Sequence, residues 1–359
     1  MSDIIERYDA AEQSGIASIS NAAIAAFRLS TFDQVGFPTR VHSLQELWRY
    51  HDSMQDGRFE TNLRYLDQAS IEEVELCRTA AEVISRFAED GLKRPTPGRD
   101  ALSRALLQYH LIGSILHNVP RPWRLVEIGP GSGYLGLLIG LAGHHYEAVE
   151  ACQAFYIYQN RLWTFAFGDT YLDGLSAGSS EAIVRHVPWW NVCKTGFMFS
   201  TTDLFVSNHA LAEMTPPAMR RIFQLARKTH PKSVRILAEG LGKPRTPHRA
   251  VLSTAAGLGF GALELAGTIR DAWLFEAVAG VTPVIDSRDS SSRIRLLWRK
   301  ILRLPVVGQP IRRIERGLRG CRVSTGQSSD AAGGAEKLRN VFSVYPTEPL
   351  ANEQFMKGL

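Results

Sequence analysis

A glycine-rich loop between a strand-like and a helix-like stretch is the part of this sequence with the clearest chemistry. Glu127, Gly129, Gly131 and Gly133 form an E-x-G-x-G-x-G pattern between WRLVEI and YLGLLIGLAG. Where a strand turns into a helix, backbone N–H groups and the helix dipole favour an anion, and glycines let a ligand approach the backbone. Glu150 follows Gly131 by nineteen residues, at the expected end of the next strand, where a carboxylate can accept both hydroxyls of a ribose. The loop and the acid together predict a nucleotide-containing cofactor.

Two cofactors fit this pattern, because Gly131, Gly133 and Gly136 also spell the G-x-G-x-x-G fingerprint of dinucleotide binding. Glu127 favours one of them. A carboxylate at the end of the first strand would repel a pyrophosphate, yet it can pair with the positively charged methionyl part of S-adenosylmethionine. We therefore expect S-adenosylmethionine in preference to a nicotinamide dinucleotide. A glycine-rich turn without a ligand is the third interpretation, and the coincident Glu150 argues against it.

A second group of polar residues follows a later strand, in the segment DLFVSNHALAEM. Ligands of open parallel sheets bind at the carboxyl ends of the strands, which is where Asn208 and His209 would lie. His209 is the candidate general base, since its ordinary pKa near 6.5 suits proton acceptance around neutrality. Glu213 could orient the imidazole or act as the base itself. The alternatives are a packed loop histidine at 209 and a helix-capping carboxylate at 213.

Trp189 and Trp190 come directly after the third expected strand, at the same edge of the sheet. Aromatic faces suit the apolar C–H faces of sugar rings, so the pair could form a stacking platform for a substrate. A hydrophobic plug beneath a loop explains the two tryptophans equally well. Both interpretations stay open at this point.

The elements that would position these residues are strands alternating with helices, which predicts a parallel sheet covered on both faces. After Glu150, strands are expected at Ala182–Val187, Asp203–Ser207 and Val234–Ala238, helices at Gln153–Phe167, Pro216–Thr229 and Pro247–Leu258, and an edge hairpin at Ala262–Ile269 and Trp273–Val278. Residues 1–120 are expected to be α-helical, as the apolar stripe within Ile71–Phe87 illustrates.

This order of elements resembles the class I S-adenosylmethionine-dependent methyltransferases over about Trp123 to Val281. The resemblance is carried by VEIGPGSG, by YEAVEA with its terminal acid, and by the final hairpin. More narrowly, YEAVEACQAFYIYQNRLW and DLFVSNHALAEM are similar to segments of sugar O-methyltransferases associated with glycan biosynthesis. The resemblance implies an α/β, Rossmann-like, seven-stranded methyltransferase domain at 121–283, a helical N-terminal region at 1–120 and a basic extension at 284–359.

What the narrower resemblance implies for function is methyl transfer to a hydroxyl of a sugar or glycan intermediate. Methylation of a non-sugar small molecule at oxygen or nitrogen, and a non-catalytic binding module of this fold in a glycan-assembly complex, are the alternatives. The sequence departs from many relatives after the third strand, where HVPWWNV lacks an acidic residue for adenine. Adenine recognition is therefore unassigned.

The net charge of +5 is concentrated in one segment of the chain. Residues 293–322 hold ten basic side chains and one acid, whereas the rest holds 31 basic and 35 acidic residues. Such a basic amphipathic segment could pack on the protein's own body, lie on an anionic membrane surface, or bind an anionic nucleotide-linked or lipid-linked sugar. A net acidic body makes nucleic acid an unexpected partner.

Neither a disulfide framework nor a metal site is predicted. Cys77, Cys152, Cys193 and Cys321 are far apart, with no C-x-x-C pair and no histidine at ligand spacing, which favours a reducing compartment. The N-terminus has no apolar secretory segment, and the longest apolar run, Tyr134–Gly143, is shorter than the roughly 20 residues of a membrane span. We expect a cytoplasmic protein, with peripheral contact to the inner membrane face if the basic segment binds lipid.

Overall fold

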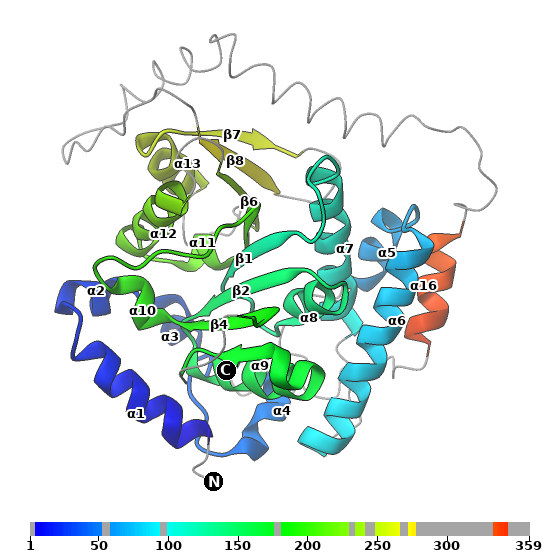
Figure 1. Ribbon diagram of the computed structural model, residues 1–359, viewed down its shortest axis with the longest axis horizontal. Helices are drawn as coiled ribbons and strands as arrows, with labels where there is room; N and C mark the ends of the chain where they lie inside the picture. The colour runs from blue at the N-terminus through cyan, green and yellow to red at the C-terminus, as the bar shows by residue number, and fades with distance from the viewer. Residues whose placement is uncertain are drawn as a thin grey trace.

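A single mixed sheet of eight strands forms the centre of the protein (Figure 1). The computed structural model describes residues 4–51, 58–93, 99–175, 181–229, 234–240, 248–265, 272–277 and 333–343. The strands are β1 (Arg124–Ile128), β2 (His145–Glu150), β3 (Tyr171–Asp173), β4 (Val184–Pro188), β5 (Leu204–Asn208), β6 (Arg235–Glu239), β7 (Phe260–Glu264) and β8 (Trp273–Ala277). Their order is β3-β4-β2-β1-β5-β6-β8-β7, and β8 runs antiparallel to both of its neighbours while the other pairs are parallel.

The sheet has one strand more than the seven that the resemblance implied. The additional strand is β3, which has three residues and pairs with β4 at the edge of the sheet. A stretch this short carries no readable alternation of apolar and polar residues, so the sequence did not indicate it. With the antiparallel strand β8 between β6 and β7, the other seven strands have the order β4-β2-β1-β5-β6-β8-β7.

The N-terminal part of the chain is helical, as its apolar periodicity predicted. Its helices are α1 (Ile4–Ile16), α2 (Asn21–Ala26), α3 (Ser30–Val35), α4 (Trp48–His51), α5 (Phe59–Tyr65), α6 (Ile71–Arg86) and α7 (Arg99–Ile115), with a 3₁₀ turn at Leu44–Leu47 and a π-helical turn at Phe87–Leu92. A capping box starts α6, in which the Ser70 hydroxyl accepts from the Glu73 N–H and the Glu73 carboxylate accepts from the Ser70 N–H.

The helices that connect the strands cover both faces of the sheet. They are α8 (Tyr134–Leu141), α9 (Gln153–Phe167), α10 (Trp189–Cys193), α11 (Ala210–Glu213), α12 (Pro216–Thr229) and α13 (His248–Gly257), with a 3₁₀ turn at Gly168–Thr170. In Figure 1, α12 and α13 lie on one side of the sheet and α7 and α8 on the other. Alternation along β1 reflects this, because Leu125 belongs to the core beneath α7 and α8 whereas Val126 and Ile128 belong to the opposite core.

A helix near the C-terminus packs against the N-terminal region rather than against the sheet. This helix, α16 (Gly334–Phe342), lies beside α5 and α6 (Figure 1). Phe342 meets Phe59 edge-on with ring centroids 5.1 Å apart, and Arg339 pairs with Glu60 at 2.9 Å. The sequence assigned these residues to the basic extension at 284–359 without a helix at 334–342, so α16 is an element that it did not predict.

The basic segment 293–322 lies outside the described residues. Among the helices that the structure describes, none is long and apolar enough to cross a membrane.

Candidate functional site

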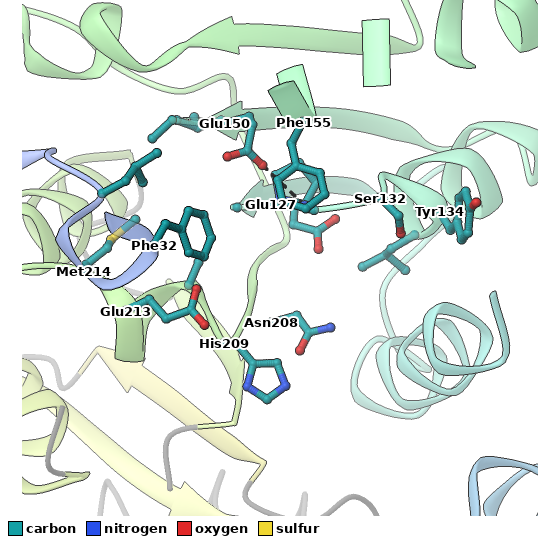
Figure 2. A pocket seen from close by; sticks show the side chains of 18 of the residues that line it. Phe32, Glu127, Ser132, Tyr134, Glu150, Phe155, Asn208, His209, Glu213 and Met214 are labelled. Carbon is teal, nitrogen blue, oxygen red and sulfur yellow. Dashed lines mark hydrogen bonds between the residues drawn. The ribbon is translucent and has the colours of Figure 1, made fainter. Parts of the chain in front are cut away.

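A cavity of about 320 Å³ opens at the carboxyl ends of the central strands. The strand order reverses at this place, because β1 pairs with β2 on one side and with β5 on the other. Side chains cannot close the crevice between loops that leave the sheet in opposite directions, which is why ligands of open α/β sheets bind there. The cavity is lined by the loops after β1, β2 and β5, by one side of α7, and by residues 26–32 (Figure 2).

The glycine loop lies at the floor of the cavity, which Gly129 and Gly131 line. Gly129, Gly131 and Gly133 all have positive φ values, of 71°, 59° and 74°. Glycine adopts this backbone conformation without strain. A β-carbon on Gly129 would lie 2.5 Å from the Ala210 β-carbon, so this position also needs glycine for space. Gly133 directly precedes α8, and the helix therefore begins at the cavity wall.

Glu150 closes the loop from the end of β2. Its Oε1 accepts from the Cys152 N–H at 2.9 Å, and its Oε2 accepts from the Gly131 N–H at 3.3 Å and from Gln159 Nε2 at 3.2 Å. Burial raises the pKa of Glu150 to about 7, although these donors oppose the shift. The carboxyl group lines the cavity, where ligand hydroxyls can reach it.

Glu127, at the end of β1, lies almost completely buried beneath the same cavity. The Tyr146 hydroxyl donates to its Oε2 at 2.5 Å. Burial is the main reason that the pKa of Glu127 rises to about 8; the negative charges of Glu150 and Glu239 raise it further, and the Tyr146 hydrogen bond lowers it. A cation placed here would favour the ionised form, whereas a second anion would be opposed by all three carboxylates.

The end of β5 and the residues after it form the opposite wall. Asn208, His209 and Glu213 all line the cavity, so the structure brings them together with the cofactor loop (Figure 2). His209 has a φ of 64°, uncommon for a residue with a side chain, and its N–H donates to the Glu239 carbonyl at 3.0 Å. Its ring lies over Gly240, where a β-carbon would collide with the imidazole. Gly240 is thus what leaves room for the ring.

Arg104 is a cavity residue that the sequence did not single out. It comes from α7, and its guanidinium donates to Asn208 Oδ1 at 2.9 Å and contacts His209 Nε2. Gln108, one turn further along α7, also lines the cavity. The sequence feature that could have indicated these two residues is an arginine and a glutamine one turn apart in a mostly buried helix. Periodicity alone could not show that α7 lies against the end of β5.

Residues 26–32, between and within α2 and α3, form another wall that the sequence did not predict. Phe27, Leu29 and Phe32 contribute apolar side chains, and Phe155 and Met214 add to this part of the lining. The segment is held in place by Thr215, whose hydroxyl donates to the Ala26 carbonyl at 2.5 Å. The N-terminal helices therefore supply part of the site itself.

Trp189 and Trp190 are not among the residues that line the cavity. Both are buried, with exposed fractions of 7% and 4%. Trp190 packs edge-on against Tyr8, and Trp189 stacks on Phe27 and donates from Nε1 to Glu12 Oε1 at 3.0 Å. Because α1 covers this edge of the sheet, the structure corresponds to the hydrophobic plug and not to the substrate platform.

Two further polar residues, one in β4 and one at the end of β6, also have definite positions. His186 is buried in a ring stack, 3.6 Å from the centroid of Tyr156, and does not line the cavity. Glu239 is 3% exposed beside Asn208 in the sheet register, and its Oε1 has no hydrogen-bond partner. Burial raises the pKa of Glu239, and the charge of Arg104 opposes this shift.

Within the part of the chain that the structure describes, no three His, Cys, Asp or Glu side chains are grouped so that they could hold a metal ion. The described cysteines, Cys77, Cys152 and Cys193, are free thiols. Cys321 lies outside the described residues.

Comparison with known proteins gives only distant structural similarity. No family model matches the chain, and no curated protein matches it. Solved structures that are similar include magnesium protoporphyrin IX methyltransferase from Synechocystis PCC 6803 with bound SAM, at 11% identity and a TM-score of 0.36 over 58% of this chain and 97% of that one. An O-methyltransferase from neocarzinostatin biosynthesis in complex with S-adenosyl-L-homocysteine has 13% identity and a TM-score of 0.31, covering 50% and 57%. The pyocyanin biosynthetic protein PhzM has 13% identity and a TM-score of 0.34, covering 50% and 58%. Because these sequence identities and TM-scores are low, the function of this chain has to be inferred from its own site.

Proposed function

We propose that this protein is an S-adenosylmethionine-dependent O-methyltransferase. The observation that carries the proposal is the convergence of the glycine loop, Glu127 and Glu150 on one cavity at the reversal of the strand order. Glycines with positive φ leave the backbone open to a ligand, Glu150 offers oxygens to ribose hydroxyls, and Glu127 offers a negative charge to an ammonium or sulfonium group. These glycines and the two glutamates therefore fit S-adenosylmethionine.

A nicotinamide dinucleotide fits the same residues less well. Its pyrophosphate would have to lie over the loop, above Glu127, with Glu150 and Glu239 adding negative charge from nearby. Three arginines, Arg28, Arg58 and Arg104, also line the cavity. Of these, Arg104 contacts Asn208 and His209, which belong to the wall opposite the glycine loop. The electrostatics of the floor thus favour a cationic ligand.

S-adenosylmethionine supplies an activated methyl group, so the main task of the protein is to hold the acceptor oxygen in line with it, about 3 Å away. A base that removes the hydroxyl proton would add roughly 10² to 10⁴ in rate. We assign this task to the pair His209 and Glu213. His209 Nε2 contacts the Arg104 guanidinium, so we propose Glu213 as the group that takes the proton and His209 as a residue that shapes the wall.

For the acceptor we propose a hydroxyl of a sugar or glycan intermediate, nucleotide-linked or lipid-linked, as the resemblance of YEAVEACQAFYIYQNRLW and DLFVSNHALAEM to sugar O-methyltransferase segments implies. The aromatic faces of Phe27, Phe32 and Phe155 are surfaces on which the C–H face of a sugar ring could stack. The same apolar lining favours a second candidate, a planar aromatic small molecule that carries a hydroxyl group. A non-catalytic binding module would share the donor site but show no turnover.

The first test is calorimetry of the purified full chain with S-adenosylmethionine and, separately, with NAD. We expect binding of the methyl donor and none of NAD, and Glu150→Ala should weaken donor binding at least tenfold because a ribose hydroxyl loses its acceptor. Absence of donor binding by the wild type would refute the proposal. Labelled-methyl transfer to a panel of nucleotide sugars and hydroxylated aromatics then identifies the acceptor class.

The second test separates the two base candidates once an acceptor is known. Glu213→Gln is expected to lower kcat by roughly 10² with little change in KM, since the base acts in the transition state. His209→Asn should change KM as much as kcat. The opposite pattern would make His209 the base.

A further inference from the structure

The N-terminal helix α7 delivers a positive charge to the crevice that the methyltransferase loops alone would leave acidic. Arg104 lines the cavity together with Ala101, Ala105 and Gln108, which lie on the same side of α7. The two alanines have small side chains, and Arg104 itself lines the cavity, so a ligand in the cavity can reach it. Arg104 is half-buried, and it acts electrostatically on Glu239 at the end of β6.

The contacts of Arg104 fix where this charge lies. Its guanidinium donates to Asn208 Oδ1 at 2.9 Å and contacts the His209 ring; Asn208 is the last residue of β5, and His209 follows it directly. Strand β5 pairs with β1, whose end carries Glu127, with Val206 of β5 opposite Glu127. Arg104 and Glu127 therefore lie on two walls of one crevice, one beyond β5 and the other beneath the glycine loop.

This arrangement offers opposite charges to the two ends of a zwitterion. An α-amino acid has an ammonium and a carboxylate on one carbon, and the methyl donor ends in such a group. Glu127 can receive the ammonium, and the planar guanidinium has five N–H donors in a fork that matches a carboxylate in two parallel bonds. Lysine in this position would offer a point charge without the fork.

We propose that Arg104 binds the carboxylate of the amino-acid part of the donor nucleoside. The inference rests on the proposed function, since it concerns the same cavity and the same donor. It assigns a donor-binding role to the N-terminal helical region, for which the sequence predicted no binding residue. Asn208 is then a positioning residue, because its Oδ1 holds the guanidinium in place.

A carboxylate or phosphate on the acceptor is the other anion that Arg104 could receive. The two sources differ in a simple way. Donor binding can be measured with no acceptor present, and a nucleoside without the amino-acid part contains no carboxylate. Comparing S-adenosylhomocysteine with 5′-methylthioadenosine therefore isolates the contribution of the amino-acid group.

The experiment is calorimetry of both nucleosides with the full chain and with Arg104→Gln, Arg104→Lys and Arg99→Gln. We expect Arg104→Gln to weaken S-adenosylhomocysteine binding about 10- to 100-fold, as for loss of a charge-assisted bidentate pair, and to leave 5′-methylthioadenosine binding unchanged. Arg104→Lys should bind S-adenosylhomocysteine with an affinity between those of the wild type and Arg104→Gln. Arg99→Gln is the matched control, because Arg99 belongs to the same helix but stacks over Phe59 and is not part of the cavity lining.

The outcomes separate the two proposals. If the wild type binds neither nucleoside, the proposed function itself fails. If the wild type binds both and Arg104→Gln binds S-adenosylhomocysteine equally well, only the role of Arg104 is refuted. An equal loss for the two nucleosides would also refute it, since a carboxylate contact cannot affect a ligand without a carboxylate. Unchanged circular dichroism and thermal unfolding of Arg104→Gln confirm that the variant is folded.

Discussion

Gly129 combines two reasons for being glycine, and a matched control can separate them. Its φ of 71° strains any other residue, and a β-carbon would lie 2.5 Å from that of Ala210. Gly143 has nearly the same φ, 75°, but a β-carbon there would meet no atom within 4 Å. Both Gly→Ala variants should lose about 1 kcal/mol of folding free energy to backbone strain. Only Gly129→Ala should also lose donor binding, because the loop and Ala210 must move apart.

Urea unfolding and calorimetric titration with S-adenosylmethionine check this prediction. Donor binding by Gly129→Ala that equals that of Gly143→Ala would show that the loop tolerates a side chain, and the close approach to Ala210 would then have no functional meaning.

The buried carboxyl groups of the site predict a pH dependence of donor binding. Burial raises the pKa of Glu127 to about 8 and that of Glu150 to about 7, so the empty site holds protons near neutrality. A cationic ligand favours the ionised form and releases a proton. Affinity should therefore rise with pH from 6 to about 8, by at most about tenfold per pH unit for one proton, and then level off.

Calorimetry at several pH values, in buffers of different ionisation enthalpy, measures both the affinity and the proton release. Glu127→Gln should bind the donor more weakly and lose most of the pH dependence. An affinity that is independent of pH in the wild type would contradict the assignment of Glu127 to the cationic group.

At the scale of helices, an ion pair connects α7, which carries Arg104, to the start of α6. His110 Nδ1 lies 2.9 Å from Glu73 Oε1, and Glu73 also belongs to the capping box of α6. The hydrogen bond to Glu73 raises the pKa of His110, against the effect of burial. A raised pKa means that the pair stabilises the fold fully below the ordinary histidine pKa, and that this contribution is lost as pH rises through the folded-state value.

His110→Gln should consequently cost about 1.5 kcal/mol of unfolding free energy at pH 5.5 and much less at pH 8.5. Urea denaturation of both proteins at the two pH values measures the difference. A cost that is equal at both would mean that the charge of His110 does not contribute.

Helix α16 gives the second prediction at this scale. Leu338 is fully buried where α16 packs on α5 and α6, whereas Lys337 beside it is exposed. Leu338→Ala should lower the unfolding free energy by about 2 to 5 kcal/mol because it leaves a cavity. Lys337→Ala, the matched control, should change it by less than about 0.5 kcal/mol. A small effect of Leu338→Ala would show that α16 is not needed to complete this core.

Helices and strands with a strong apolar periodicity were predictable from the sequence. Short elements that are stabilised mainly by the strands or helices they pack against were not. The bounds expected for α9 and α12, Gln153–Phe167 and Pro216–Thr229, are those of the structure. Strand β3 and helix α16 were missed, the first because three residues show no pattern, the second because its short amphipathic stretch adjoins a Ser/Gly/Ala-rich segment. Their stability comes from β4, α5 and α6, which sequence periodicity does not reveal.

Considered over the whole molecule, the same distinction applies to the site. Glu127, Gly129, Gly131 and Glu150, which local motifs singled out, all line one cavity, because β1, the loop after it, α8 and β2 position them as one unit. Arg104 and Phe27 come from the N-terminal region, and only the packing of α7 and residues 26–32 on the sheet brings them to the cavity. One hydrophobic core runs from Ile4 through α6, α7 and α8 to Phe342. The regions 1–120 and 121–283 thus share a core and the cavity, and residues 333–343, the described part of 284–359, contribute to the same core.

The charge distribution leads to the last prediction, which concerns the basic segment 293–322. Ten basic residues and one acid lie there, beside a body with 31 basic and 35 acidic residues. We propose peripheral membrane contact through this segment, since basic amphipathic stretches are attracted to anionic lipid by about 1 kcal/mol per basic residue near the surface. The full chain should float with phosphatidylglycerol vesicles at low salt, and a chain lacking 293–322 should not. Phosphatidylcholine vesicles and 0.5 M salt are the controls, because neutral lipid removes the attraction and salt at that concentration screens it within about 5 Å.

Equal flotation of the full chain and of the chain lacking 293–322 would place the membrane contact elsewhere. Flotation of neither, together with binding of a nucleotide sugar by the full chain alone, would assign the segment to an anionic acceptor instead.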